Sequence, residues 1–168
     1  MIIVYLALGS NVGDCAGYIR QAVGLLDEFL ADVRQAPVYR SKAAGFLDQP
    51  DFLNTAVSGQ TNLDPLDILQ AVKGIEQRLG RTPTFRNGPR EIDIDLILYG
   101  NEVLDSDKLT VPHPRFRERD FVLQPLIDLD SELRDPISGE RLIVMLNALD
   151  TASRSIVGKL SAGTDPEP

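Results

Sequence analysis

The order of the hydrophobic patterns along the chain is the feature that most constrains its fold. Short apolar runs typical of strands alternate with helical stripes in the order strand, helix, strand, strand, helix, strand. The strands are expected at residues 2–8, 33–41, 52–61 and 91–99, and the helices at 14–30 and 64–79. This βαββαβ order is that of a ferredoxin-like core. We therefore predict an α+β fold with an antiparallel sheet, both helices on one face, and the other face free to carry a site.

Local signals mark where the elements begin and end. Asp64 is a suitable N-cap and Pro65 a suitable first residue for the second helix, and Gly80 follows its last turn. The last third of the chain is expected to be irregular, because prolines recur between residues 105 and 126. A short helix is expected near Gly139 to Leu149.

The composition is that of an ordinary globular protein, with 43% hydrophobic and 25% charged residues. We expect a single domain over residues 1–160 and a disordered tail at 161–168. No apolar run approaches the roughly 20 residues of a membrane span, and the first residues lack the basic region of a signal peptide. The single cysteine, Cys15, excludes an internal disulfide and is typical of a reducing cytoplasm. We expect a cytoplasmic monomer.

The charge distribution favours a small anionic ligand. A net charge of -8 argues against a general nucleic-acid binder, which usually carries a basic surface. Positive residues are nevertheless concentrated in the middle of the chain. They are Lys73, Arg78, Arg81, Arg86, Arg90, Lys108, Arg115, Arg117 and Arg119. Any one of these is equally well explained as a solvated surface residue, but together they indicate a basic site in an acidic protein.

Two aspartates interrupt the apolar alternation of the fourth strand. Successive side chains of a strand point to opposite faces, so Asp93 and Asp95 project the same way, with Cα atoms roughly 6.5 Å apart. Their face is expected to hold Glu91, Ile97 and Tyr99, and the other face Ile92, Ile94, Leu96 and Leu98. Carboxylates this close repel each other unless a cation lies between them. Mg²⁺ suits this pair better than zinc, which prefers thiolate and imidazole ligands; the alternative is the polar, solvent-facing side of an edge strand.

The loop before this strand is rich in arginine. Arg81, Arg86 and Arg90 are separated by two prolines and a glycine. Guanidinium groups make bidentate contacts with phosphate oxygens, so three of them beside two aspartates fit a triphosphate with its magnesium. The alternative is a flexible basic loop without a role. Glu76 lies on the apolar stripe of the preceding helix, either at the edge of the core or held by a ligand.

Other side chains are candidates for ligand contacts. His113, the only histidine, lies between two prolines and is either structural or a donor to a phosphate. Phe52 and Asn54 share one face of the third strand, and Phe121 follows the arginine-rich segment. Two aromatic rings with an amide can hold a flat polar heterocycle, although a phenylalanine in a strand is more often part of the core.

Several longer motifs occur in a specific order. They are "DQPDFLN" from Asp48, "GPREIDIDLILYG" from Gly88, "LTVPHPR" from Leu109 and "RDFVLQPL" from Arg119. Together they resemble the 6-hydroxymethyl-7,8-dihydropterin pyrophosphokinase family, over a stretch from Ala7 to about Leu149. The resemblance implies a ferredoxin-like core and an ATP-dependent diphosphotransferase of folate biosynthesis. Such an enzyme uses two Mg²⁺ ions to move pyrophosphate from ATP to the hydroxymethyl group of the pterin, and it releases AMP.

The resemblance also implies roles for residues at the matching positions. Asp93 and Asp95 would bind the metal, and Arg81 and Arg90 would be the catalytic arginines of the loop. The implied ATP-binding residues are Glu76, Arg90, Leu96, Lys108, Thr110, His113 and Arg119. The implied pterin-binding residues are Ser41, Phe52, Asn54 and Phe121. No residue is expected to act as an obligatory general base.

The chain departs from the family pattern at several positions near the expected site. Asn87 stands where the family usually has a tryptophan, Pro83 where an arginine can occur, and Lys73 where a glutamine-like contact is found. The resemblance implies that the loops at 42–51 and 81–90 close over the substrates and exclude water.

Two other functions remain open from the residues themselves. A magnesium-dependent phosphohydrolase or nuclease would use the same aspartates, although no residue stands out to activate a water. A non-catalytic RNA-binding module would use the sheet face, but it would need sheet-borne aromatic residues and a basic face that the sequence lacks.

Overall fold

A computed structural model describes residues 1–43 and 48–160 of the chain. The strands of the main sheet are β1 (Ile2–Ser10), β2 (Ala31–Gln35), β3 (Tyr39–Ser41), β4 (Phe52–Thr61), β5 (Asp93–Tyr99) and β8 (Ile156–Lys159). Their order is β5-β1-β4-β3-β8, with β2 also paired to β4, and every pairing is antiparallel. A separate hairpin contains β6 (Leu104–Asp105) and β7 (Thr110–Val111). The tail expected at 161–168 and part of the loop expected at 42–51 lie outside the described residues.

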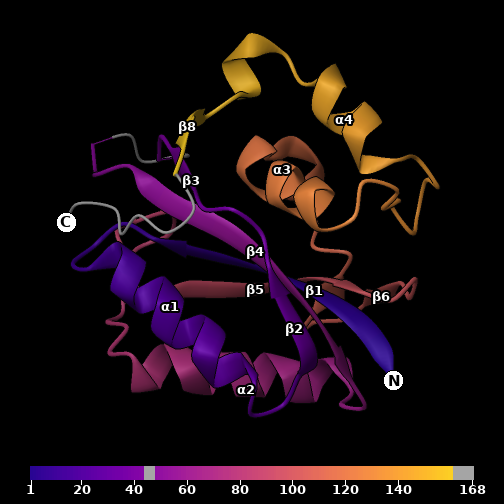
Figure 1. The fold of residues 1–168 in the computed structure, drawn as a ribbon, viewed down its shortest axis with the longest axis horizontal. Helices are drawn as coiled ribbons and strands as arrows, with labels where there is room; N and C mark the ends of the chain where they lie inside the picture. Colours follow the sequence, from indigo (N-terminus) through magenta and orange to yellow (C-terminus); the bar gives the residue numbers. More distant parts are fainter. Residues whose placement is uncertain (44–47, 161–168) are drawn as a thin grey trace.

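The helices are α1 (Cys15–Leu26), α2 (Pro65–Arg78), α3 (Asp120–Leu129) and α4 (Leu142–Ala148), with 3₁₀ turns at η1 (Phe116–Glu118) and η2 (Thr151–Ser153). Figure 1 shows α1 and α2 on one face of the sheet and α3 and α4 on the other. None of the helices in the described part of the chain combines the length and apolar character that crossing a membrane requires. The predicted α+β fold with an antiparallel sheet is confirmed.

The first hydrophobic core holds the predicted helices against the sheet. Ile19 of α1 and Val72 of α2 are buried with Leu6 of β1 and Ile94 of β5. Both helices therefore cover one face, as the amphipathic stripes predict. α1 ends at Leu26, four residues before the expected end, because the chain turns there with bonds from Glu28 N–H to Leu25 and from Phe29 N–H to Leu26.

The second core was not predicted. Phe116, Leu123 and Leu126 pack against Ala56 of β4 and Ile97 of β5, so α3 covers part of the face that we expected to be free. The last third of the chain is therefore more regular than its prolines indicate. A proline in a helix interior removes a hydrogen bond, and burial of most of α3 offsets that loss.

The prediction of a single strand at 33–41 is corrected at a proline. The strand expected at 33–41 is divided into β2 and β3, because Pro37 lies between them and has no N–H to donate. The hydroxyl of Thr55 lies 2.9 Å from the carbonyl oxygen of Ala36 and 3.2 Å from that of Pro37, and its single hydrogen is shared between them. This side-chain contact helps to satisfy the backbone carbonyls at the break.

A β-bulge in β5 changes which face its last residues occupy. Tyr5 of β1 lies opposite Leu98 and its neighbour Leu6 opposite Leu96, so one residue of β5, Ile97, has no partner on β1. An extra residue reverses the alternation beyond it. Leu98 consequently joins the second core and Tyr99 the first, the reverse of the expected faces. The aspartates precede the bulge and keep their expected common face.

Candidate active site

The two aspartates lie beside an open part of the sheet. Asp93 is paired across the sheet with Gly9, and Asp95 with Ala7. Glycine and alanine are the two smallest residues, and residues paired directly across antiparallel strands point to the same face. Space is therefore left above β1 next to both carboxylates. A Cβ atom at Gly9 would lie 2.9 Å from Oδ1 of Asn54, so any larger residue here would displace the Asn54 amide.

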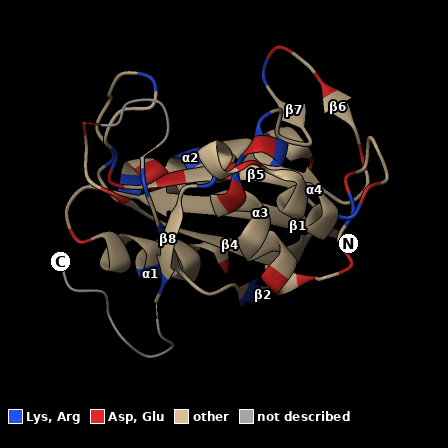
Figure 2. Ribbon diagram, turned by 90° about the horizontal axis from the view of Figure 1, so that it is seen from above, with Lys and Arg blue, Asp and Glu red and all other residues tan. Residues whose placement is uncertain are grey.

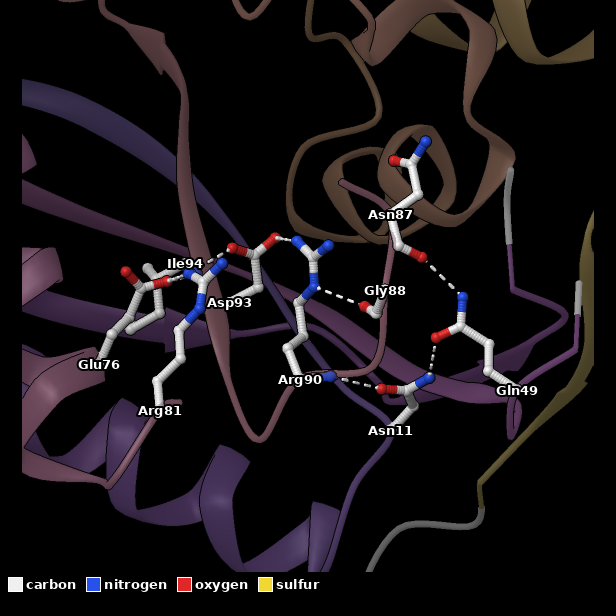
Figure 3. Close-up of polar contacts among 9 residues, drawn as sticks. All are labelled: Asn11, Gln49, Glu76, Arg81, Asn87, Gly88, Arg90, Asp93 and Ile94. Atoms are coloured by element: carbon white, nitrogen blue, oxygen red, sulfur yellow. Dashed lines mark hydrogen bonds and ion pairs between the residues drawn. The ribbon is translucent and has the colours of Figure 1, made fainter. Parts of the chain in front are cut away.

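Arg81 and Arg90, the two arginines predicted to be catalytic, both bind Asp93 (Figure 3). Arg81 Nη1 lies 3.0 Å from Asp93 Oδ1, and Arg90 Nη1 lies 3.2 Å from Asp93 Oδ2. Arg81 Nη1 also lies 2.5 Å from Oε2 of Glu76, which accepts a second bond from the Ile94 N–H at 2.9 Å. Glu76 is therefore buried at the edge of the core, the first of the two alternatives left open by the sequence, and its carboxylate is paired with a site arginine.

Asn11 joins the arginine loop to the loop before β4, as Figure 3 shows. Its side-chain oxygen accepts from the Arg90 N–H at 2.9 Å, and its own N–H donates to the Arg90 carbonyl at 3.1 Å. Its amide nitrogen donates to Oε1 of Gln49, and Gln49 in turn donates to the Asn87 carbonyl at 2.7 Å. Asn87 has a φ of 61°, a left-handed conformation that asparagine tolerates better than most residues. Asn11 thus connects both loops to the end of β1.

Asn11 and Gln49 are not among the site residues predicted from the sequence. The available signal was their position, since Asn11 directly follows the first strand and Gln49 lies in the motif before β4. Asn11 is 3% exposed. A buried amide must find hydrogen-bond partners, but the sequence does not indicate which loops supply them.

Asp95 differs electrostatically from its neighbour. Within the described residues, no hydrogen bond or ion pair reaches its carboxylate, whereas Asp93 binds two arginines. Burial, followed by the charges of Asp93 and Glu76, raises the pKa of Asp95 to about 7, in spite of the nearby Arg119 and Arg90. Ionising Asp95 next to another carboxylate is costly, and a bound cation would stabilise its ionised form.

An open pocket, about 660 Å³ when the adjoining solvent space is included, contains most of the predicted site. Its lining includes both aspartates, Arg90 and Arg119, and all residues assigned by resemblance to the pterin: Ser41, Phe52, Asn54 and Phe121. Asn54 donates from its amide nitrogen to the Ser41 hydroxyl at 2.6 Å. The pocket lies on the sheet face opposite α1 and α2, beside the start of α3. It therefore places two aromatic rings, an amide and a hydroxyl within one space that also holds the carboxylates.

The remaining residues predicted to contact ATP do not line this pocket. Leu96 is buried in the first core, so only its backbone is available to a ligand. Thr110 lies in β7, where its hydroxyl bonds Asp105, and Lys108 is exposed on the turn before it. Because β7 packs beside β5, this hairpin extends the site along β5 and away from the pocket.

His113 is held in one tautomer by its own loop. Its Nδ1 accepts a hydrogen bond from the Arg115 N–H at 3.2 Å, so a neutral ring carries its proton on Nε2. Burial, together with Arg119, lowers the pKa of His113 from 6.5 to about 4; Arg115 acts in the same direction and Asp93 opposes it. At neutral pH the ring is therefore uncharged, with one N–H to donate.

The shifted pKa of His113 predicts a pH-dependent contribution to stability. The unfolded chain binds a proton near pH 6.5, whereas the folded protein binds it only near pH 4, so the free energy of unfolding falls as the pH drops through this window. We expect the wild type to lose about 1–2 kcal/mol more than His113→Gln between pH 7 and pH 4, allowing for partial exposure of the ring. Urea unfolding of both proteins across this range measures the difference. Parallel curves would show that folding does not lower the pKa of the ring.

Comparison with known proteins identifies the family to which the chain belongs. The family model described as 7,8-dihydro-6-hydroxymethylpterin-pyrophosphokinase (HPPK) matches residues 5–131. The chain belongs to the HPPK family. A protein of Aquifex aeolicus named 2-amino-4-hydroxy-6-hydroxymethyldihydropteridine pyrophosphokinase is 45% identical over 137 residues, covering 82% of this chain and 86% of its own. A Bacillus subtilis protein of the same name is 44% identical over 129 residues, covering 76% and 77%. The resemblance inferred from the motifs is confirmed.

Solved structures agree with the HPPK fold. A structure described as HPPK-DHPS in complex with substrates matches with a TM-score of 0.70 at 15% identity, over 88% of this chain and 43% of that chain. Wild-type HPPK-DHPS from Plasmodium falciparum matches with a TM-score of 0.69 at 14% identity, over 87% and 41%. The chain spans less than half of these longer proteins. At this identity the likeness shows the fold alone.

The carboxylates of this HPPK-family chain fit a magnesium ion that arrives with a nucleotide. Among residues 1–43 and 48–160 there is no group of three or more His, Cys, Asp or Glu side chains suited to a metal. Mg²⁺ takes one or two carboxylates and completes its shell with water and phosphate oxygens, which matches Asp93 and Asp95.

Proposed function

We propose that the chain transfers the pyrophosphoryl group of ATP to the hydroxyl of 6-hydroxymethyl-7,8-dihydropterin, in the route to folate. The observation that carries this proposal is the shared pocket, in which Asp93 and Asp95 lie with Phe52, Asn54 and Phe121. Membership of the HPPK family supports it, because relatives are named for this activity. A pocket for a phosphate substrate alone would not need two aromatic rings beside its carboxylates.

The pocket residues suggest how the pterin is held. Phe52 and Phe121 line the pocket and would offer aromatic rings against which a flat heterocycle can stack. Asn54 and Ser41 are buried and already bonded to each other, so their remaining hydrogen-bonding capacity faces the pocket as a rigid polar edge. Such an arrangement recognises the amide and amino groups of a pterin at low entropic cost.

The phosphates are proposed to lie between the aspartates and the arginine loop. Two Mg²⁺ ions held by Asp93 and Asp95 would neutralise charge on the phosphate oxygens. Arg81 and Arg90 now pair with Asp93, and phosphate oxygens beside the aspartates would offer them a further acceptor. Glu76, Leu96, Lys108, Thr110, His113 and Arg119 are proposed to contact the rest of the nucleotide, which would extend along β5 toward the β6–β7 hairpin.

The reaction is a single displacement at phosphorus. The pterin hydroxyl oxygen forms a bond to the β-phosphorus of ATP, and the bond from that phosphorus to the α,β-bridging oxygen breaks. The electron pair of the broken bond stays on the α-phosphate, so AMP leaves, and the hydroxyl proton passes to water. The protein contributes positioning and charge stabilisation. Water exclusion by the loops joined through Asn11 protects ATP from hydrolysis.

The test of the proposed function is the identity of the nucleotide product. Purified protein with Mg²⁺, ATP and 6-hydroxymethyl-7,8-dihydropterin should release AMP and the pterin diphosphate in equal amounts, and EDTA should abolish turnover. Release of ADP would exclude pyrophosphoryl transfer. Hydrolysis of ATP at the same rate without the pterin would instead favour the alternative, a magnesium-dependent phosphohydrolase using the same aspartates.

We also propose that residues 1–160 act as one domain, as a cytoplasmic monomer that binds neither nucleic acid nor membrane. The net charge of -8 supports the absence of nucleic-acid binding. Acidic and basic segments lie next to each other around β5 in Figure 2, which suits a small-ligand site better than a polyanion surface. Light scattering during size-exclusion chromatography tests the oligomeric state.

A further inference from the structure

A buried aspartate at the start of α3 holds a segment near the C-terminal end of the chain. Asp120 is 3% exposed, and its carboxylate accepts three hydrogen bonds. The Ser155 hydroxyl donates to Oδ1 at 2.7 Å, and the N–H groups of Ser155 and Ile156 donate to Oδ2 at 2.8 and 2.9 Å. Hydrogen bonds to an ionised acceptor are about twice as strong as neutral ones, so this contact fixes the two residues firmly.

The same two residues are bonded to β3 on their other side. The carbonyl of Ser155 accepts from the Lys42 N–H at 2.9 Å, and Ile156 is paired with Ser41. The pairing continues along β8, and Leu160 N–H donates to the Val38 carbonyl at 2.9 Å. β8 therefore lies at the edge of the sheet beside β3, as Figure 1 shows.

Ser155 and Ile156 are bonded to two elements that each form a wall of the pocket: the start of α3, and the end of β3 with Lys42. On the helix side, Asp120 is flanked in sequence by Arg119 and Phe121, which both line the pocket. On the sheet side, Ser41 and Lys42 line it as well. Ser155 and Ile156 thus connect the two walls through hydrogen bonds. Ser155 and Ile156 lie outside residues 5–131, the part of the chain that the family model matches, whereas Asp120 and Ser41 lie within it.

We propose that Ser155 and Asp120 are positioning residues that set the separation of the two pocket walls, and with it the affinity for the pterin. The inference rests on the proposed function. The walls carry the ring of Phe121 on one side and the Ser41 hydroxyl on the other, and stacking and hydrogen bonding both depend on separations defined within a fraction of an ångström. Within the described residues, neither Ser155 nor the Asp120 carboxylate makes a hydrogen bond with the arginine loop or the β6–β7 hairpin. Of the residues proposed to contact the nucleotide, only Arg119 adjoins Asp120 in sequence.

The test measures two affinities on the full-length protein. Isothermal titration calorimetry gives one Kd for 6-hydroxymethyl-7,8-dihydropterin and another for a magnesium complex of a non-hydrolysable ATP analogue. Ser155→Ala removes only the hydroxyl bond to Asp120 and is expected to raise the pterin Kd about 5–10-fold, less than the full value of one charge-assisted hydrogen bond, because the pterin senses that bond only through the position of the wall. The nucleotide Kd is expected to stay within about twofold. Asp120→Asn removes the charge from the acceptor and should raise the pterin Kd further.

Two matched variants separate positioning from general damage. Ser155→Thr keeps the hydroxyl and should bind the pterin as the wild type does. Ser153→Ala makes the same chemical change two residues away, at an exposed side chain without a pocket contact, and should leave both values of Kd unchanged.

The Kd values of these variants decide whether the inference holds. An unchanged pterin Kd in Ser155→Ala, or an equal loss for pterin and nucleotide, overturns the inference. If Asp120→Asn does not fold, Ser155→Ala and Ser155→Thr still provide the comparison. Failure of the proposed function looks different, because the wild type itself would then bind no pterin or release no AMP.

Discussion

Asp95→Asn is expected to lower kcat for AMP formation by about 10³-fold, because it removes one of the two charges proposed to hold the metal. Asparagine has nearly the same shape as aspartate, so the pocket should keep its form. The carboxylate makes no hydrogen bond or ion pair within the described residues, which means that no protein contact is lost with it. The loss should therefore appear in turnover and in the Mg²⁺ concentration needed for half-maximal rate.

Stability should change in the opposite direction to activity. Burial and the neighbouring carboxylates raise the pKa of Asp95 to about 7, so ionised Asp95 destabilises the folded protein without its metal. Asp95→Asn should consequently be at least as stable as the wild type in EDTA at pH 8, measured by urea unfolding. Asp67→Asn removes the same charge from an exposed position on α2 and should leave kcat unchanged. Full activity of Asp95→Asn would remove Asp95 from the metal site.

Arg90→Lys is expected to lower kcat by about 10²-fold, although the positive charge is kept. The guanidinium of Arg90 reaches Asp93 through Nη1 and the Gly88 carbonyl through Nε, at 3.2 Å each. Lysine offers one flexible donor group in place of this planar fork, so it cannot hold both partners or bind a phosphate in the bidentate mode. The backbone bonds between Arg90 and Asn11 do not involve the side chain, so the loop itself should stay anchored.

Arg86→Lys provides the matched control for the same loop. Arg86 is exposed on the segment before Asn87 and does not line the pocket. We expect its kcat to stay within about twofold of the wild type, measured by the same AMP assay. Equal losses in the two variants would show that the loop responds to any change of charge geometry, and they would remove the specific role of Arg90.

The local features of the sequence predict most of the fold. The amphipathic stripes place α1 and α2 on one face, and Asp64 and Pro65 mark the start of α2, because these signals act within a few residues. α3 was missed because Pro125 lies inside it, and only its burial against β4 and β5 makes a helix favourable there. The β8 strand was missed for a similar reason, since its partner β3 is more than one hundred residues away in sequence.

The candidate site was predictable in its components and less so in its connections. The spacing of Asp93 and Asp95 placed both on one face, because the bulge that reverses the alternation comes only after them. The hydrogen bonds of Asn11 and the connection through Ser155 were not predictable, since they join loops that no local pattern relates. The assigned roles of the pocket residues remain predictions.

The sequence by itself determined the chemical groups of the site and the family, because motifs such as "GPREIDIDLILYG" combine charge, turn and strand signals within a few residues. The tertiary structure alone decided which of these groups meet. It left space above Gly9 and Ala7, paired Arg81 and Arg90 with one aspartate but not the other, and brought Phe121 and Ser41 to opposite walls of one pocket. The physical reason is that pairing, burial and charge compensation depend on residues distant in sequence, whose positions are set only when the whole chain packs.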